Sequence, residues 1–485
     1  MGPHLRNALV AALALATAAP AAAGDSCSLP GGASWREYRS RHFVIDAADW
    51  DRDPARVVAE FEDVHAALLA TLIAEPVEIP GHVRVIVVPS ASDLADYAGS
   101  RNILGLFWIS PLAEPIILIR SHDAEEVPQI VAHELAHYLS SYVFPRQPFW
   151  FSEGLAQFLE SVGKADDKGH RWAGDDPAEG WAAGSIKLQR MAALLAGEGG
   201  WYDVDPVRTA WILYRFLWNE RSKQFGEYQR LLMDGEAPDE AWGRAFPEWE
   251  IKSGKVNLLD YYVYHHQLNG RGVRWPVKLG EVDHKFTSGA APLGDVHLAL
   301  LGLRLLHTNS LIQNRTRRLA MEEAAREDPG HPVANAELAR LGKGPLVPAL
   351  RMVAEARPKD GRGWYLLGLE SADPAEREKA LRRAVDNWPD GALAHAALAR
   401  QLATTGRARE ALPLANRAVD LAPWHPTTVS SLATVAVELG QCKQALVLQT
   451  RAVEVVQSKR VGSEGADATE VKNRLGEIRK RCSAQ

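Results

Sequence analysis

The sequence lacks several features that would place it in a specialised class of protein. It has no large Lys/Arg cluster and carries a formal charge of −6 at pH 7, which argues against a surface built to bind nucleic acid. Past the first 23 residues, no apolar run reaches the length that spans a bilayer. Cysteine is scarce: Cys27, Cys442 and Cys482 are the only three, and none lies near the motifs that carry chemistry.

The first 23 residues have the three parts of a secretory signal peptide. Arg6 supplies an early positive charge, an Ala/Leu run extends from Ala8 to Ala19, and three alanines precede Gly24. A buried N-terminal helix or an uncleaved anchor is the alternative. We therefore predict an exported protein, periplasmic or secreted, with no integral membrane segment after cleavage.

An exported location permits disulfide bonds. Cys442 and Cys482 lie on neighbouring C-terminal segments, so the spacing favours a bond between them and leaves Cys27 free.

The length of 485 residues indicates two or three domains, and a composition of 46% hydrophobic and 24% charged residues is that of a soluble globular protein. Residues 34–247 are expected to form an α+β domain, a small mixed sheet with helices on it. Strands are predicted at 41–47, 82–90, 104–110 and 115–121, and helices at 54–73, 92–99 and through most of 125–247. Residues 248–293 contain Gly-rich pieces and form a boundary region to which we assign no role.

The C-terminal domain, residues 294–485, contains a repeat. Pro389 and Pro423 are 34 residues apart, as are Gly406 and Gly440, and alanines recur in the same phase. This period resembles the tetratricopeptide repeat, in which two helices form each unit. The match is clear over about 361–457, with two full units and a shortened one, and is degenerate upstream. An unrelated helical bundle is the alternative to an all-α tetratricopeptide-repeat solenoid.

The stretch "IVAHELAHYLSSYVFPRQPFWFSEGLAQFLE" carries the candidate chemistry. On a helix, His133 and His137 lie one turn apart on one face, where two imidazoles can bind one zinc ion. Glu134 then lies beside the metal, placed to act as general base towards a zinc-bound water. A chance HExxH, with surface histidines and a solvated glutamate, is the alternative. Glu153 follows in a turn-and-helix context and is the candidate third ligand.

The pair HELAH and WFSEGLA resembles the gluzincin zinc metallopeptidases, whose aminopeptidase-like branch carries its third ligand in a Trp-Leu-x-Glu-Gly-Phe-Ala frame. The closest resemblance is to the peptidase MA-like group, often exported and often fused to tetratricopeptide repeats. The resemblance covers roughly residues 35–247. It implies a zincin-like fold, Zn²⁺ as cofactor, His133, His137 and Glu153 as metal ligands, and Glu134 as general base.

Other residues are weaker candidates. Gluzincins of the aminopeptidase type place a tyrosine downstream of the third ligand as an oxyanion donor. Tyr214 is the best match and Tyr202 a weaker one, although a core tyrosine is equally consistent with the pattern around Tyr214. Glu160, on the same helix face as Glu153, is either a partner for a ligand imidazole or a solvated charge. The adjacent His265 and His266 are predicted to be surface or packing residues.

One feature of the aminopeptidases is missing. No Gly-x-Met-x-Asn-like strand precedes the HELAH helix; "PIILIRS", residues 115–121, occupies that place and is predicted to be an edge strand that pairs with an extended peptide. Exopeptidase and endopeptidase activity both remain open.

The sequence therefore predicts an exported zinc metallopeptidase that hydrolyses peptide bonds of a peptide or protein substrate, with repeats that bind substrate or a protein partner. The alternative is a non-catalytic repeat adaptor in which a metal stabilises a zincin scaffold. The intact Glu134 favours the enzyme, because a structural zinc needs no general base. The substrate, the partner and the oligomeric state stay undetermined.

Overall fold

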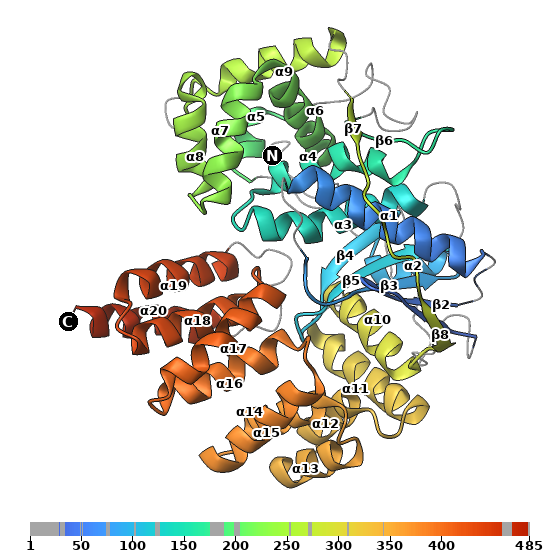
Figure 1. Ribbon diagram of the computed structural model, residues 1–485, viewed down its shortest axis with the longest axis vertical. Coiled ribbons are helices and arrows are strands. Elements are labelled where there is room, and N and C mark those ends of the chain that lie inside the picture. The colour runs from blue at the N-terminus through green and yellow to red at the C-terminus, as the bar shows by residue number, and fades with distance from the viewer. Residues whose placement is uncertain are drawn as a thin grey trace, which may run out of the picture.

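The structure is a computed structural model of the chain (Figure 1). It describes residues 29, 34–48, 50, 52–73, 78–100, 103–121, 127–174, 189–197, 204–251, 254–269, 274–307, 310–342, 344–457 and 468–483. The predicted signal peptide, Cys27 and Tyr202 lie outside these residues. Within them, no helix combines the length and the apolar character needed to cross a membrane.

A six-stranded mixed sheet in the order β4-β5-β3-β2-β1-β8 forms the centre of the first domain. Its strands are β1 (Arg36–Arg39), β2 (Phe43–Ala47), β3 (Val83–Val88), β4 (Gly105–Ile109), β5 (Pro115–Arg120) and β8 (Thr287–Ala290). The strands β2, β3 and β5 run parallel, whereas β4, β1 and β8 pair antiparallel with their neighbours. Four of these strands were predicted from the sequence; β1 and β8 were not.

Helices cover both faces of the sheet because successive side chains of a strand point to opposite sides. Val85 and Val87 of β3 join the core beneath α1 (Pro54–Leu72) and α3 (Val127–Val143). Ile86 and Val88 of the same strand join a second core with α2 (Ala91–Ala98) and α10 (Leu293–His307). The near-continuous apolar sequence of β3 reflects this two-sided burial.

Strand order corrects one expectation. Pro115–Arg120 is not an edge strand: β5 lies between β3 and β4, and β4 forms the edge. The physical reason is that β5 pairs parallel with β3 on one side. Its hairpin partner β4, which precedes it in the chain, can then pair with it only on the other side.

The segment 248–293 has a structural role that the sequence did not reveal. Its strand β8 pairs antiparallel with β1 and extends the sheet, and β7 (Trp275–Val277) pairs with β6 (Arg171–Ala173). The helix α9 (Asn257–Asn269) also lies in it. The described strands of this segment therefore extend the sheet of the first domain and pair with its β6.

The helices after α3 pack around a group of buried aromatic rings, and α5 to α9 lie together above the sheet (Figure 1). They are α4 (Phe149–Glu160), α5 (Met191–Leu195), α6 (Val204–Glu220), α7 (Ser222–Met233) and α8 (Pro238–Ala245), with short 3-10 turns at Ser161–Gly163 and Pro247–Trp249. The Trp150 ring stacks on Tyr228 and meets Trp242 edge-on. These contacts fix α4, the helix that carries the predicted third ligand, against α7 and α8.

Helical hairpins form the C-terminal part, a tetratricopeptide-like array that curves below the sheet (Figure 1). The helices are α11 (Ser310–Glu327), α12 (Pro332–Leu341), α13 (Leu346–Ala356), α14 (Gly361–Glu370), α15 (Pro374–Asn387), α16 (Ala392–Thr404), α17 (Ala408–Leu421), α18 (Pro426–Glu438), α19 (Cys442–Gln457) and α20 (Ala468–Cys482). From α16 to α18 and from α17 to α19 the starting residues advance by 34, the predicted period.

The turns inside these hairpins explain the repeated glycines. Gly406 and Gly440 adopt φ values of 83° and 78°, the left-handed region that glycine enters without steric cost. The unit that begins at Gly361 is shorter, because α16 starts only 31 residues after α14.

Two sets of contacts join the array to the first domain. Asp295 of α10 meets Arg84 of β3 at 3.9 Å and His331 at 2.7 Å, and it also accepts from Arg362 of α14. On the other side, the Tyr142 hydroxyl of α3 donates to the Leu421 carbonyl at 3.1 Å.

The predicted disulfide between Cys442 and Cys482 is present and joins the start of α19 to the end of α20 across 40 residues. Closing a loop of this length stabilises a folded chain by about 4 kcal/mol in the chain-entropy treatment. We expect Cys442→Ser to lower the free energy of unfolding of this helix pair by about 2–4 kcal/mol, measured by urea denaturation under oxidising conditions. Reductant should lower the wild type to the level of the variant and leave the variant unchanged; an equal response of both proteins would contradict the assignment.

Candidate metal centre

The HELAH sequence lies on α3, whose apolar residues face the sheet and turn the two histidines to the opposite side. Leu135 and Leu139 are buried in the main core, whereas the His133 and His137 side chains keep 15% and 9% of their surface exposed. Their ring centroids are 5.0 Å apart, with the ring planes at 82°. The predicted one-turn spacing therefore brings both imidazoles to one place.

Glu153 on α4 lies opposite the two imidazoles. Its Oε1 is 3.4 Å from the His137 Nε2, and its Oε2 is 3.9 Å from the His133 Nε2. One ligand atom from each of the three residues lies within 4.8 Å of the others. Gly154 permits α4 to pack closely on α6, since a Cβ there would lie 2.6 Å from the Tyr214 Cβ and 2.8 Å from the Ala210 carbonyl oxygen of α6.

The outer nitrogen of each imidazole also has a partner. The His137 Nδ1 is 3.0 Å from the Ser152 hydroxyl oxygen, and the His133 Nδ1 is 3.2 Å from the Gln157 amide nitrogen and 3.6 Å from Glu160. Partners at Nδ1 fix the ring orientation and leave Nε2 directed at Glu153. Glu160 therefore lies beside the His133 imidazole, as in the first of the two alternatives considered for it.

The side-chain amide of Gln157 can face the His133 ring with either its nitrogen or its oxygen. As placed, its Oε1 is buried without a hydrogen-bond partner among the described residues, while its nitrogen faces the His133 Nδ1. Exchange of the two atoms, which the shape of an amide allows, lets the buried oxygen accept from an Nδ1–H. With this exchange, the neutral His133 ring carries its proton on Nδ1 and leaves Nε2 able to bind a metal.

Ser152 and Gln157 were not identified as site residues from the sequence. By its type and its place just before Glu153, Ser152 could be a helix cap, but α4 already begins at Phe149 and its cap position, Pro148, has no side-chain cap. One signal was available: Gln157 and Glu160 follow Glu153 at helical spacing, four and seven residues later, on the same face.

The pKa values of the three converging residues shift in different directions because the groups are buried together. Burial raises the pKa of Glu153 to about 7, with the Glu134 charge adding to the effect and the His133 charge opposing it. Burial lowers the pKa of His133, but the contacts with Glu160, Glu134 and Glu153 outweigh it and raise that pKa to about 9. Burial and the His133 charge hold the pKa of His137 well below its usual range.

Glu134 extends from α3 towards the edge of the sheet. Its Oε2 accepts the Phe107 backbone N–H of β4 at 2.7 Å. Burial raises the pKa of the Glu134 carboxyl, while the His133 charge and this hydrogen bond oppose the rise. Gly105 permits the approach of β4, since a Cβ there would lie 2.4 Å from the Ile130 side chain and 3.2 Å from that of Glu134.

Tyr214, the candidate oxyanion donor, is a buried residue of α6. Tyr214 is 1% exposed in the aromatic core, with Phe151 and Phe158 beside its ring, and its hydroxyl accepts from Gln229 at 3.3 Å. Burial raises the pKa of this hydroxyl far above its usual range, with the Gln229 contact opposing the rise. This is the position of a core tyrosine, and we do not assign Tyr214 an oxyanion role. His265 is exposed on α9 and contacts Tyr261, as expected of a surface residue.

The chemistry and spacing of the donor set fit zinc. Two imidazole nitrogens and one carboxylate are ligands that zinc prefers, and tetrahedral bonds of about 2.0–2.2 Å place ligand atoms roughly 3.4 Å apart. The two Nε2–carboxylate distances of 3.4 and 3.9 Å are close to that value. Three protein ligands would leave one coordination position for water or substrate, the pattern of catalytic rather than structural zinc sites.

We expect Ser152→Ala to weaken zinc binding by about 10- to 100-fold, because the His137 ring loses the hydroxyl that orients it. Titration against a fluorescent zinc chelator measures the change. Ser141→Ala is the matched control, since Ser141 lies on the same helix as His137 but donates to the Tyr138 carbonyl. Equal affinities of the Ser152 and Ser141 variants would show that the hydroxyl does not support the site.

Comparison with known proteins identifies no family for the metal centre: no protein-family model matches the chain, and no curated protein matches it. Among solved structures, the chain is similar to a thermophilic TPR protein of Thermus thermophilus, at 19% identity and a TM-score of 0.29, covering 39% of this chain and 99% of that one. It is also similar to the MamA protein, at 14% identity and a TM-score of 0.24, covering 34% and 93%. The helical hairpins and their period are the basis for describing a repeat array here.

Proposed function

We propose that this chain is a zinc-dependent peptidase whose helical repeats bind a protein substrate or partner. The observation that carries the proposal is the convergence of His133, His137 and Glu153 within 4.8 Å, with Glu134 beside them on the same helix as the histidines. The partners at both Nδ1 atoms support it further, because they orient both rings with Nε2 towards Glu153.

Zinc bound by these three residues would act as a Lewis acid and lower the pKa of a water ligand to about 7. Glu134 is positioned to accept a proton from the attacking water and to return it to the leaving amine. Its raised pKa suits this task, since a carboxyl that titrates closer to neutral pH can both accept and donate a proton there. The Phe107 N–H holds the carboxylate in place.

The edge strand β4 is the proposed binding site for the substrate backbone. In an antiparallel pair, alternate residues direct their N–H and C=O groups away from the partner strand. The Phe107 N–H bonds Glu134, so Gly105, Phe107 and Ile109 face the open edge. An extended peptide added at this edge would run past Glu134 and the metal ligands.

Export remains part of the proposal, supported by the signal-peptide pattern of residues 1–23 and by the disulfide of the repeat array. The repeats would hold the partner or substrate near the cleft, since the array contacts α3 itself. The Trp424 ring lies 5.3 Å from that of Tyr138, the residue after His137.

Metal analysis tests the proposal. The full chain, purified without chelator, should contain one zinc per molecule; removing it should abolish cleavage of casein, and adding zinc should restore it. His133→Ala and Glu153→Ala should each lose the metal, because two remaining ligands hold zinc poorly. His265→Ala, a change at an exposed histidine, should retain it. Full zinc occupancy in Glu153→Ala would refute the ligand assignment.

The repeat array supports a second proposal, a non-catalytic adaptor in which the metal only stabilises the first domain. It predicts zinc without cleavage, and it also predicts that substitution of Glu134 has no functional effect. Replacing Glu134 by glutamine separates the two proposals.

A further inference from the structure

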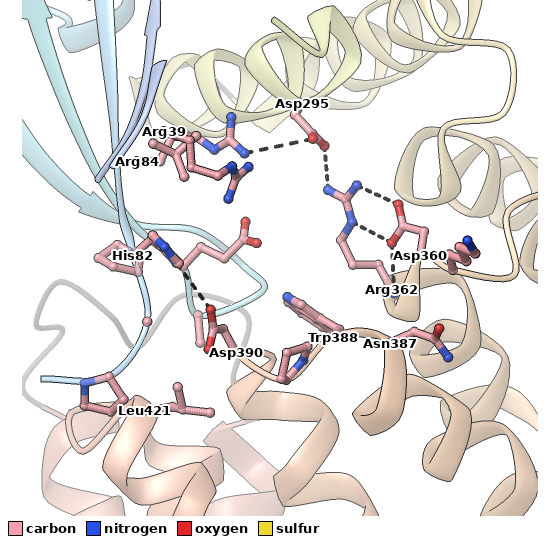
Figure 2. A pocket seen from close by; sticks show the side chains of 18 of the residues that line it. Arg39, His82, Arg84, Asp295, Asp360, Arg362, Asn387, Trp388, Asp390 and Leu421 are labelled. Atoms are coloured by element: carbon pink, nitrogen blue, oxygen red, sulfur yellow. Dashed lines mark hydrogen bonds and ion pairs between the residues drawn. The ribbon is translucent and has the colours of Figure 1, made fainter. Parts of the chain in front are cut away.

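A cavity of about 680 Å³ lies between one end of the sheet and the repeat array (Figure 2). The first domain contributes residues near the N-terminal ends of β2, β3 and β5 and in the β4–β5 turn, and the array contributes the connections before α14, α16 and α18. None of the metal-centre residues lines it. Its volume is typical of small-molecule sites, which often lie between domains, and corresponds to the share of roughly twenty waters.

Most charged side chains that line the cavity are already paired. His82 meets Asp390 at 3.3 Å, and Arg362 bonds both Asp295 and Asp360, as Figure 2 shows. Three other arginines of the lining also form ion pairs: Arg84 with Asp46, Arg357 with Asp328, and Arg39 with Glu37. Among the residues that the structure describes, two charged side chains of the lining have no ion pair, Glu114 and Lys359.

Glu114 is held at the wall by an unusual turn. Ala113, the residue before it, has φ 62°, a conformation that residues other than glycine rarely adopt. The Ser110 hydroxyl stabilises the turn by accepting the Leu112 and Glu114 backbone N–H groups at 3.2 and 3.1 Å. Such strain persists where the surroundings impose it, and it is concentrated at binding and catalytic sites.

The surroundings of Glu114 favour a cationic ligand group. Burial raises the pKa of this carboxyl, and the charges of Arg362 and Arg84 oppose the rise without cancelling it. Both arginines already pair with Asp295. A ligand ammonium would therefore supply the direct partner that the ionised carboxylate lacks.

We propose that this cavity binds a short peptide with free termini, whose ammonium group pairs with Glu114 and whose carboxylate pairs with Lys359. The two charges belong to different domains, the β4–β5 turn and the α13–α14 connection, so a zwitterion would bridge them. The volume exceeds what a single amino acid fills, and Trp388, Val44 and Pro115 offer apolar surface for side chains. The site is separate from the metal centre and does not depend on its activity.

Calorimetric titration of the full chain carrying Glu134→Gln, which prevents cleavage, tests the proposal with trialanine as the probe. We expect one site per chain with a Kd below about 1 mM. N-acetyl-trialanine and trialanine amide, each lacking one terminal charge, should bind at least about tenfold more weakly. Equal binding of all three peptides, or no binding of trialanine, would overturn the proposal.

Substitutions of Glu114 and Lys359 test whether the peptide binds in this cavity. Glu114→Gln should remove the preference for the free amino terminus, and Lys359→Met the preference for the free carboxylate. Glu322→Gln and Lys379→Met, at exposed positions outside the cavity, are the matched controls and should bind like the parent. Melting temperatures establish that each variant is folded. If His133→Ala abolishes binding while the Glu114 and Lys359 variants retain both preferences, the peptide binds at the metal cluster and the proposal is wrong.

Discussion

Replacing Glu134 by glutamine is expected to lower kcat for peptide cleavage by about 10²- to 10⁴-fold and to leave the zinc content unchanged. The amide keeps the size of the side chain and an oxygen that can accept the Phe107 N–H, so the fold should be preserved. What it loses is the ability to take a proton from water and deliver it to the leaving amine. Metal analysis and cleavage of a quenched fluorescent peptide library measure the two quantities separately.

The matched control is Glu240→Gln, the same change at an exposed position of α8 in the same domain. It should retain both zinc and activity. A Glu134 variant that binds zinc and cleaves as fast as the wild type would contradict the general-base role. A wild type that binds zinc but cleaves no peptide would favour the adaptor.

The convergence of His133, His137 and Glu153 could be predicted from local spacing and from a short sequence frame. Two histidines four apart on a helix lie on one face in any fold, and the frame around Glu153 was recognisable by resemblance. The partners of the imidazoles are harder to predict, because they depend on how α4 crosses α3. Ser152 resembled a cap from its position in the sequence, and only the crossing shows that its hydroxyl meets the His137 Nδ1.

The same distinction applies to the sheet. The strands that are buried on both faces have apolar, β-branched sequences and were predicted, whereas β1 (REYR) and β8 (TSGA) are short, mostly polar and have no such signal. Their pairing also joins Arg36 to Ala290, residues far apart in the chain. Strand order is equally hard to predict, because nothing in the sequence of the β4–β5 hairpin shows which of its strands pairs with β3.

Tyr214 illustrates a limit of arguing from resemblance. Its distance from Glu153 along the chain suited an oxyanion donor, but the residues around it, including Trp211, Leu213 and Leu217, form an apolar surface that buries in the core. The hydrophobic pattern of α6 was the stronger physical signal, because burying a helix face stabilises the fold more than one polar contact does.

The junction between the sheet and the repeats carries the second large expected effect. Asp295 is largely buried, with 14% of its side chain exposed, and it meets Arg84, His331 and Arg362. Asp295→Ala would leave these cationic or hydrogen-bonding groups without their shared carboxylate. Because breaking a buried ion pair costs about 3–5 kcal/mol, we expect a loss of about 3 kcal/mol in the free energy of unfolding at pH 7, measured by urea denaturation.

The effect should depend on pH in a direction that follows from the pKa of Asp295. Burial opposes ionisation of this carboxyl, but its bonds with His331, Arg362 and Arg84 outweigh burial and hold its pKa well below its usual value. A carboxylate with a lowered folded-state pKa contributes its full stabilisation above its unfolded pKa, about 3.9, and loses it as the pH falls. The difference between wild type and variant should therefore be larger at pH 7 than at pH 3.

Asp46, whose pKa burial raises to about 6, has a contribution of the opposite pH dependence. The Asp295 charge makes only a small contribution to that rise, so its removal lowers the pKa of Asp46 and makes the expected difference at pH 7 somewhat smaller without reversing it. Asp386→Ala, at an exposed aspartate of α15, is the control and should change stability little at either pH. If the Asp295 variant unfolds at the same urea concentration as the wild type at pH 7, the junction does not hold the array to the sheet. The proposed peptide cavity, which needs both of its walls in place, would then lack its structural basis.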